Sequence, residues 1–383
     1  MANTLKFGNG QWAVKKGSAL AYNDENNNFK PLPFTFDRDS SATRVNKDGL
    51  IETVGSGEPR VDYTDSAEGA MLLEPSRTNR ITNSNDFTTN WSNLISGTGV
   101  NPIVTSNQDI SPDGTLNADK VVFNLNGGNT SSDYSLLDYS LSGFSNPHTL
   151  DTSIYLKSSD GNNYQVAIYN RGTSVQIITV TNQWQRFSVN GIRSNTTNNF
   201  RIGLFGHSSS NTASLLLFGS QAELGSYPTS YIPTQGSVQT RNSDSCLQGG
   251  FQDKNIFGST QGSAVFEFKW DIGSYVFDFS DALGIRIRIF DGNTDWKIRD
   301  YTGASWVNTG FSKSNNVKTK IAFKWNGTQF TSFQDGVKSS STDGFASSLS
   351  IERITTNKLN NVSNMQFYNT ALTDQELINL TTI

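Results

Sequence analysis

The stretch Ile285-Arg-Ile-Arg-Ile-Phe290 has an apolar side chain at every second position, and Ala264-Val-Phe-Glu-Phe-Lys-Trp270 follows a similar rule. Successive side chains of a β-strand point to opposite faces of the sheet, so this alternation predicts strands with one buried and one solvated face. Asp335-Gly336 is a hairpin-turn signal in the same region. The last part of the chain is therefore expected to be an antiparallel β-sandwich.

A second series of strands precedes this region. Seven runs rich in β-branched and aromatic residues are separated by Asn and Gly at turn positions, with no helical period between them. Their spacing predicts a jelly-roll-like antiparallel sandwich that ends at Pro228 and Pro233. The expected strands are 118–123, 152–156, 165–169, 175–180, 184–189, 200–205 and 213–218.

One short helix is expected, at the C-terminal end. Thr373 and Glu376 have the spacing of a capping box, in which each side chain bonds the backbone of the other residue. Leu372 and Leu377 stand where a hydrophobic staple would place them. The helix should run for two turns, through Leu380. The expected fold class is all-β, with two sandwiches in tandem and this single helix.

The first 33 residues are polar and rich in Gly and Asn, and cannot bury enough apolar area to fold alone. They are expected to form an extended segment that docks either on another protein or on the neighbouring domain. If they dock on another protein, removing them should leave the rest folded. The spaced apolar residues that would make the docking contacts are Leu5, Phe7, Trp12, Leu20 and Tyr22.

Residues 34–78 are expected to form a small β module, with Asp48-Gly49 as a hairpin turn. The whole chain would then comprise an extended segment (1–33), this module (34–78), a jelly roll (79–240) and a second sandwich (241–383). Arginines are dense in and after the module. Either they form buried bonds that fix the module on its neighbour, which we favour, or they are solvated surface charges. They are Arg38, Arg44, Arg60, Arg77 and Arg80.

Composition excludes several classes of function. The chain has 383 residues, 30 basic and 34 acidic side chains and a net charge of −4, which gives no electrostatic reason to expect a nucleic acid or an anionic membrane as partner. No stretch reaches the length of a membrane span and no signal-peptide core is present, so synthesis and assembly in a cytoplasm are expected. One cysteine, Cys246, permits no disulfide within the chain, and only two histidines are present, so neither a metal nor a cofactor is expected.

Two strings resemble proteins of phage particles. The run Phe34 to Glu52, with Glu58-Pro-Arg60 and residues 72–79, resembles a module common in phage tail-fibre and head-fibre proteins. The opening Phe7-Gly-Asn-Gly-Gln-Trp12 is similar to the virion-attachment end of fibre proteins from phages of Bacteroidetes-type hosts. These resemblances imply a place on the virion surface, attachment to other virion proteins through the N terminus, and a homotrimer.

Two further strings resemble carbohydrate-binding folds. Residues 221–234, which include Tyr227-Pro-Thr-Ser-Tyr-Ile-Pro233, are similar to the closing segment of jelly-roll carbohydrate-binding modules. Residues 366–377 resemble the last strand and helix of concanavalin-A-like or laminin-G-like sandwiches. This resemblance implies contact with a host surface polysaccharide. A purely structural capsid or tail decoration without a glycan ligand is the alternative.

A polysaccharide depolymerase is the enzymatic alternative, and it would need two carboxylates across a sugar cleft. No glycosidase or lyase motif is recognisable, and no repeat suggests a β-helix, so the chain is expected not to be an enzyme. The acids that such a cleft could use are Asp278, Asp281, Asp291, Asp295 and Asp300.

Sugar binding by a sandwich requires flat aromatic faces beside side chains that bond hydroxyls. Around one loop of the second sandwich the sequence supplies both kinds of residue. The alternative is that Trp296 begins a strand and packs inward, as most large aromatics in sandwiches do. The expected glycan-binding residues are Trp296, Tyr301, Trp306, Asp295, Arg299 and Asn308.

Overall fold

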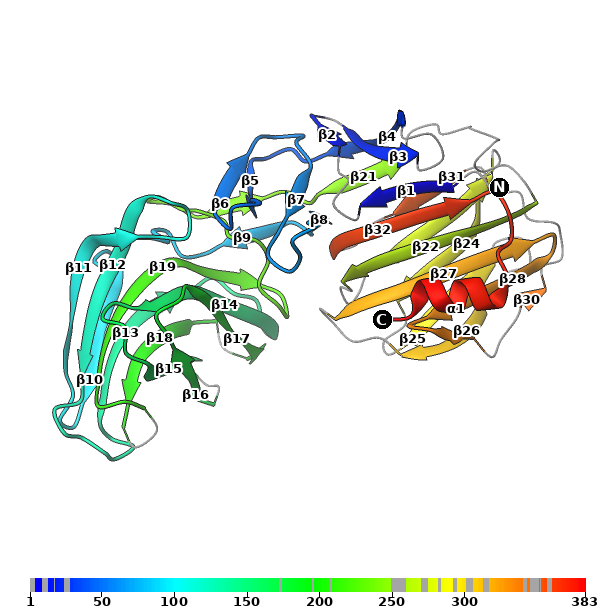
Figure 1. Cartoon of the computed structure of the whole chain (residues 1–383). Coiled ribbons are helices and arrows are strands. Elements are labelled where there is room, and N and C mark those ends of the chain that lie inside the picture. The colour runs from blue at the N-terminus through cyan, green and yellow to red at the C-terminus, as the bar shows by residue number, and fades with distance from the viewer. Residues whose placement is uncertain are drawn as a thin grey trace. The chain divides into compact units, whose positions relative to one another are not determined.

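A computed structural model shows an all-β protein, as the alternating sequence predicts. The described part of the chain contains thirty-two strands and a single helix, and every strand pair whose register is known is antiparallel (Figure 1). The structure describes residues 4–8, 13–16, 18–23, 28–171, 174–194, 196–206, 209–248, 260–269, 275–281, 284–291, 295–300, 306–312, 317–339, 343–344, 351, 353–356 and 360–383.

The chain divides into two compact units. Unit 2 comprises 50–52 and 76–241, close to the expected jelly roll, and unit 1 comprises 1–49, 53–75 and 242–383. The four expected segments therefore do not correspond to four compact parts. The extended segment, most of the small module and the second sandwich lie together in unit 1.

Unit 2 is a sandwich of two five-stranded sheets, in the orders β10-β13-β18-β15-β16 and β11-β12-β19-β14-β17. All seven strands expected from the sequence are present, and β10, β11 and β13 are additional. A two-stranded sheet of β9 (Arg77–Asn79) and β20 (Gln239–Arg241) joins its two ends. The sandwich strands are β10 (Trp91–Ser96), β11 (Val100–Ile110), β12 (Leu116–Asn124), β13 (Tyr134–Leu141), β14 (His148–Ser158), β15 (Tyr164–Asn170), β16 (Gln176–Val180), β17 (Gln185–Arg193), β18 (Asn198–Phe205) and β19 (Thr212–Leu224).

The core of unit 2 forms where the inner faces of these sheets meet. Phe123, Leu217, Phe200 and Ile202 are all fully buried there, and Trp91 packs edge-on against Tyr139 and Phe200. Each fully buried side chain of this size contributes about 1.5–3 kcal/mol relative to exposure. This core fixes which residues of each strand point outward.

Unit 1 is built on one long, curled series of paired strands. One part runs β28-β27-β22-β32-β1 and another runs β31-β23-β24-β25-β26, and β3, β4 and β21 connect them. The strands that lie wholly or partly in unit 1 are β1 (Thr4–Gly8), β2 (Ala13–Lys15), β3 (Ser18–Asn23), β4 (Asn28–Asp37), β5 (Ala42–Val45), β6 (Ile51–Val54), β7 (Arg60–Asp62), β8 (Ala70–Leu72), β21 (Ser245–Gln248), β22 (Gln261–Lys269), β23 (Tyr275–Asp281), β24 (Gly284–Asp291), β25 (Asp295–Asp300), β26 (Trp306–Ser312), β27 (Lys318–Asn326), β28 (Gln329–Gln334), β29 (Val337–Lys338), β30 (Asp343–Gly344), β31 (Arg353–Thr356) and β32 (Asn360–Tyr368).

Aromatic side chains hold the two parts of this series together. Phe279 of β23 lies 5.6 Å from Phe323 and 6.1 Å from Trp325 and Phe330, measured between ring centroids. All four rings are almost completely buried. The alternation that predicted a sandwich in this region therefore corresponds to a core between two β layers.

The expected helix is present as α1 (Asp374–Thr381). The Thr373 side chain accepts a hydrogen bond from the Glu376 backbone, and the Glu376 side chain accepts one from the Thr373 backbone, which confirms the capping box. Leu372 and Leu377 pack with Val265, Ala322 and Phe333. The hairpin turn at Asp335-Gly336 is also confirmed, since both residues have positive φ between β28 and β29.

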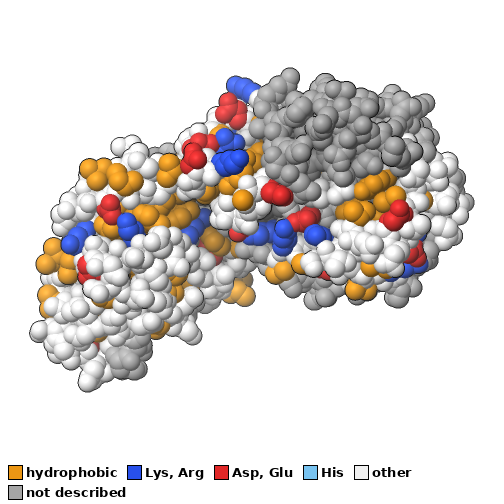
Figure 2. All heavy atoms as spheres, viewed as in Figure 1, with side chains coloured by type: hydrophobic (Ala, Val, Ile, Leu, Met, Phe, Trp, Pro, Cys, Tyr) orange, Lys and Arg blue, Asp and Glu red, His pale blue; other side chains and the backbone are white. Residues whose placement is uncertain are grey.

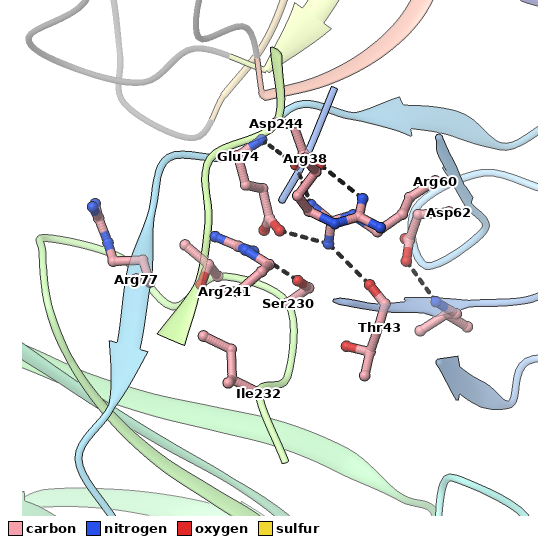
Figure 3. A network of polar contacts seen from close by, with 12 residues as sticks. Arg38, Thr43, Arg60, Asp62, Glu74, Arg77, Ser230, Ile232, Arg241 and Asp244 are labelled. Carbon is pink, nitrogen blue, oxygen red and sulfur yellow. Dashed lines mark hydrogen bonds and ion pairs between the residues drawn. The ribbon is translucent and has the colours of Figure 1, made fainter. Parts of the chain in front are cut away.

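A buried ion cluster joins distant segments of unit 1 (Figure 3). Asp244 accepts hydrogen bonds from Arg38 Nη1 at 3.0 Å and from Arg60 Nη2, and Arg60 Nη1 also lies 2.9 Å from Glu74 Oε2. The Asp244 backbone N–H donates to the Glu74 carbonyl. Arg38 and Arg60 are at most 1 % exposed. The prediction of buried arginine bonds is thus confirmed for these two residues.

The first 33 residues contribute strands to the sheet of unit 1 and are not a detached segment. β1 pairs with β32 over five residues, from Thr4 opposite Tyr368 to Gly8 opposite Asn364. β3 pairs with β1 and β4, and β4 pairs with β21. Of the two docking alternatives, the structure shows contact with the neighbouring domain. Leu5, Phe7, Leu20 and Tyr22 lie in β1 and β3, whereas Trp12 is outside the described residues.

Candidate functional site

The outer face of the β10-β13-β18-β15-β16 sheet of unit 2 carries aromatic and polar side chains together. On β18, Phe200, Ile202 and Leu204 belong to the core, so Asn199, Arg201 and Phe205 project from the other face. The same alternation on β13 and β15 places Tyr134, Asp138, Ser140 and Tyr169 on this face. We call these seven residues the sheet-face site.

The aromatic part of this site consists of three rings. Tyr134 and Phe205 are directly opposite each other on β13 and β18, and their ring planes are parallel to within 5° with centroids 6.1 Å apart. Tyr169 of β15 meets Phe205 edge-on at 6.3 Å. Tyr134 and Phe205 are only partly buried. The site therefore offers two adjacent, parallel, solvent-accessible aromatic side chains.

The polar part lies four to six residue pairs further along β13 and β18. Arg201 Nε donates to Asp138 Oδ1 at 2.6 Å, and Asn199 Nδ2 donates to Asp138 Oδ2 at 2.7 Å and to Ser140 Oγ at 3.1 Å. The Arg201 guanidinium lies 5.6 Å from the centre of the Tyr169 ring. Asp138 thus uses both oxygens to hold an arginine and an asparagine in fixed positions.

Electrostatics keep this arginine charged. Burial alone would lower the pKa of Arg201, but the hydrogen bond and the charge of Asp138, together with contact to Tyr169, raise it above the usual arginine range. Burial, opposed by Arg201, raises the pKa of Tyr169. Tyr169 is therefore neutral and Arg201 cationic at any physiological pH.

The spacing along the strands suits an extended ligand. Tyr134 and Ser140 are six residues apart on β13, which corresponds to about 20 Å along a strand. Between the aromatic and polar parts lie Leu136, Gly203 and Ala167, which pair across three strands and are buried, so a ligand would contact the two parts and not the stretch between them. Flat rings at one end and fixed hydrogen-bonding groups at the other can recognise the apolar C–H face and the hydroxyl groups of a sugar chain.

The sequence matches no protein-family model and no curated protein. Among solved structures, the chain is similar to domain 4 of AbnA, an extracellular arabinanase from Geobacillus stearothermophilus solved with arabinotriose, at 15% identity and a TM-score of 0.26, over 33% of this chain and 68% of that one.

Two other solved structures are similar with comparably low identity and TM-score. The CBM22-1 xylan-binding domain of Xyn10C from Paenibacillus barcinonensis has 14% identity and a TM-score of 0.24, over 39% of this chain and 94% of that one. Trypanosoma rangeli sialidase in complex with sialic acid has 13% identity and a TM-score of 0.28, over 94% and 65%. Likenesses this distant carry no argument about function.

The glycan-binding residues expected from the sequence lie elsewhere, in unit 1. Trp296, Asp295 and Arg299 are in β25, and Trp306 and Asn308 are in β26, with Arg299 opposite Trp306 and Lys297 opposite Asn308. Tyr301 lies outside the described residues, and so do the side chains of the other five. Trp296 is the second residue of β25, so both the alternative that it packs inward and the binding role of this group stay predictions.

The sheet-face site was missed because β13 was not expected. Tyr134-Ser-Leu-Leu-Asp-Tyr-Ser-Leu141 does carry a usable signal, because Leu137, Tyr139 and Leu141 alternate as core residues. The strand over 200–205 was expected, and its outward Arg201 and Phe205 could have been read from the same alternation. What the sequence could not show is that these two strands are neighbours.

Of the acids expected for a hydrolase cleft, only Asp278 has a described side chain. Asp278 binds Arg288 through both oxygens, at 2.6 and 2.9 Å. In unit 2, Asp151 and Glu223 face each other across β14 and β19, but both are fully buried. The side chains of Asp281, Asp291, Asp295 and Asp300 lie outside the described residues.

Among the described residues, neither surface charge nor metal ligands indicate a further site. Figure 2 shows Lys and Arg interspersed with Asp and Glu on the viewed face of the described residues. No group of three His, Cys, Asp or Glu in the described part of the chain could hold a metal ion, and no described helix has the length and apolar character needed to cross a membrane. Burial raises the pKa of Cys246 to about 12, with Asp244 adding to the shift, so the thiol stays protonated.

The buried Asp151 predicts an unusual pH dependence for unit 2. Neither of its oxygens has a hydrogen-bond partner among the described residues. Burial, and next the charge of Glu223, raise its pKa from 3.8 to about 8, against the opposing charges of Arg186 and Arg77. A raised folded-state pKa means that the contribution of Asp151 to stability is most favourable below about pH 4 and falls as the pH rises to about 8, by up to about 1.4 kcal/mol per pH unit.

The substitution Asp151→Asn should remove this loss. The variant is expected to equal the parent chain at pH 4 and to exceed it most at pH 9, in urea unfolding followed at both pH values. Asp160→Asn is the matched control, because three hydrogen bonds lower the pKa of this largely exposed carboxyl and its replacement should cost stability above pH 4. Equal pH profiles for the parent and Asp151→Asn would contradict the assignment.

Proposed function

We propose that this chain is a glycan-binding protein of a phage virion surface, and that unit 2 contacts host surface polysaccharide through the sheet-face site. The observation that carries the glycan-binding proposal is the pairing of Tyr134 and Phe205 with Arg201 and Asn199 on one sheet face. Partly exposed aromatic rings beside fixed donors are the combination that sugar recognition requires. The resemblance of residues 221–234 to carbohydrate-binding modules supports the same proposal.

The proposed activity is binding without catalysis. Asp138 is the only acid among the seven residues of the site, and Arg201 and Asn199 each bond one of its oxygens. Glycoside hydrolysis generally needs two accessible carboxyl groups. Incubation with a bound polysaccharide should therefore release no reducing ends.

The virion location is supported by the sequence resemblances alone. Attachment through the N terminus would have to involve a face of the unit 1 sheet, because residues 4–8 and 18–23 are strands within it. Gold-labelled antibody against unit 2 should decorate purified particles in electron micrographs. Particles free of label, although the protein is present in the infected cell, would contradict this part of the proposal.

Substitutions at the sheet face test the binding role. Tyr134→Ala and Arg201→Ala are each expected to weaken binding to the polysaccharide identified on a glycan array by at least about tenfold, which is about 1.4 kcal/mol. Arg80→Ala is the matched control, because this arginine also lies over an aromatic ring, Phe144, at 4.8 Å, but is not part of the site.

Thermal unfolding distinguishes loss of binding from loss of fold. Arg201→Ala leaves Asp138 with one partner fewer and should cost some stability, whereas Tyr134→Ala removes a partly exposed ring. Weak binding by Tyr134→Ala with a normal unfolding temperature supports the site. Undiminished binding by both variants would contradict it, as would an array on which the parent chain binds no glycan.

A further inference from the structure

Unit 2 contains a polar pocket of about 750 Å³ that the sheet-face site does not use. It is lined by the loop that precedes β10, by β11 and β12, and by the segment around β20. Six of its nine lining residues carry a carboxamide: Asn83, Asn85, Asn107, Asn117, Gln235 and Gln239. A volume of this size is typical of sites for small organic ligands.

Hydrogen bonds fix the orientation of two of these carboxamides. Asn83 Oδ1 accepts from the Gly236 backbone N–H at 2.7 Å, and Asn85 Oδ1 accepts from the Gly219 N–H at 3.0 Å and from the Tyr231 hydroxyl at 2.7 Å. With the oxygens held in this way, each NH₂ group has no partner among the described residues and can donate to a ligand.

Acceptors are also available. Asn117 donates through Nδ2 to Asp113 at 3.2 Å, and its Oδ1 is buried without a described partner. Asp86 takes hydrogen bonds from Thr88 and Thr89 on Oδ1, and these bonds outweigh burial and lower its pKa, so it is ionised at neutral pH. Its Oδ2 can accept from a ligand hydroxyl.

The donor and acceptor set decides the class of ligand. None of the described lining residues is Lys or Arg, so an anionic sugar or a phosphate would meet one carboxylate and no balancing charge. Hydroxyl groups both donate and accept, and they match free NH₂ groups beside free amide and carboxylate oxygens. None of the described lining residues is aromatic, so the recognition would rest on hydrogen bonds.

We propose that this carboxamide pocket is a second binding site of unit 2, for a neutral sugar. The inference deepens the proposed function and rests on it, because both sites would engage the same class of polymer. Two sites on one unit would bind a long chain more tightly than either alone, since the second contact becomes intramolecular.

Isothermal titration of the full-length protein with neutral hexasaccharides tests this directly. The probes are cellohexaose, xylohexaose, mannohexaose and N-acetylchitohexaose. The parent chain should bind two molecules of at least one probe. Gln235→Ala combined with Gln239→Ala removes two exposed carboxamides from the pocket and should eliminate one binding event or weaken it at least about tenfold. The exposed Gln183, outside the pocket, gives the control Gln183→Ala.

Comparison with Tyr134→Ala separates the two proposals. If the pocket variant loses one event and Tyr134→Ala loses the other, both are supported. If Tyr134→Ala reduces binding and the pocket variant matches Gln183→Ala, the pocket inference is wrong and the sheet-face site stands. If only the pocket variant reduces binding, the sheet-face proposal is wrong. Binding of no probe by the parent chain would overturn the pocket inference.

Discussion

A chain that lacks residues 1–33 is expected to lose the folded state of unit 1 while unit 2 stays folded. The deletion removes β1, β2, β3 and part of β4, and so takes the five-residue partner away from β32. It also removes β3, the strand that links β1 to β4, although residues 34–37 of β4, which pair with β21, remain. An exposed strand edge also promotes aggregation. We expect the calorimetric transition of unit 1 to disappear and that of unit 2 to remain.

The sequence alone predicts that the shortened chain stays folded if residues 1–33 dock on another protein. A polar stretch that cannot fold alone can often be removed without loss of the remaining fold. The unit 2 transition serves as an internal control in the same molecule. Two unchanged transitions in the shortened chain would show that β1 to β3 contribute little to unit 1. Limited proteolysis, which should degrade only 34–75 and 242–383, gives an independent readout.

Replacing Asp244 with alanine is expected to lower the free energy of unfolding of unit 1 by about 3–5 kcal/mol. Asp244 is the shared acceptor of Arg38 and Arg60, and it also accepts the Glu74 backbone N–H at 2.8 Å. Its removal leaves two fully buried guanidinium groups short of negative charge. Urea unfolding followed by tryptophan fluorescence measures the change.

The matched control is a surface ion pair of the same unit. Lys338 and Asp374 are both 40% exposed and lie 2.6 Å apart, so Lys338→Gln should cost less than about 1 kcal/mol. Glu74 offers Arg60 some compensation in the Asp244 variant. A loss for Asp244→Ala no larger than that for Lys338→Gln would show that the buried cluster is not a main support of unit 1.

The fold class could be predicted from the sequence because the alternation of apolar and polar side chains can be recognised within each short segment. Thr373 and Glu376 predicted the helix start, and the runs over 118–123 and 213–218 predicted β12 and β19, from residues within a few positions of each other. Strands that carry Asn, Ser and Thr at many positions, such as β11, gave no such signal because little of their surface is buried.

Pairing between distant strands could not be predicted in the same way. Nothing near Thr4 or Leu5 indicates Tyr368 and Phe367 as partners, because that register depends on where the intervening chain turns. The sheet-face site could not be predicted for the same reason. Its residues come from three strands whose order, β13-β18-β15, differs from their order in the sequence.

The hydrogen bond between the Asp244 N–H and the Glu74 carbonyl has a consequence for biosynthesis. The polypeptide leaves unit 1 at 75 and re-enters it at 242 beside the exit point, so unit 2 is an insertion within a discontinuous domain. On the ribosome, 76–241 can fold as soon as it emerges, whereas β1 must wait for β32, the last strand made. The chain would thus fold from its middle outward, and the adjacent ends at 75 and 242 make this junction suited to domain exchange.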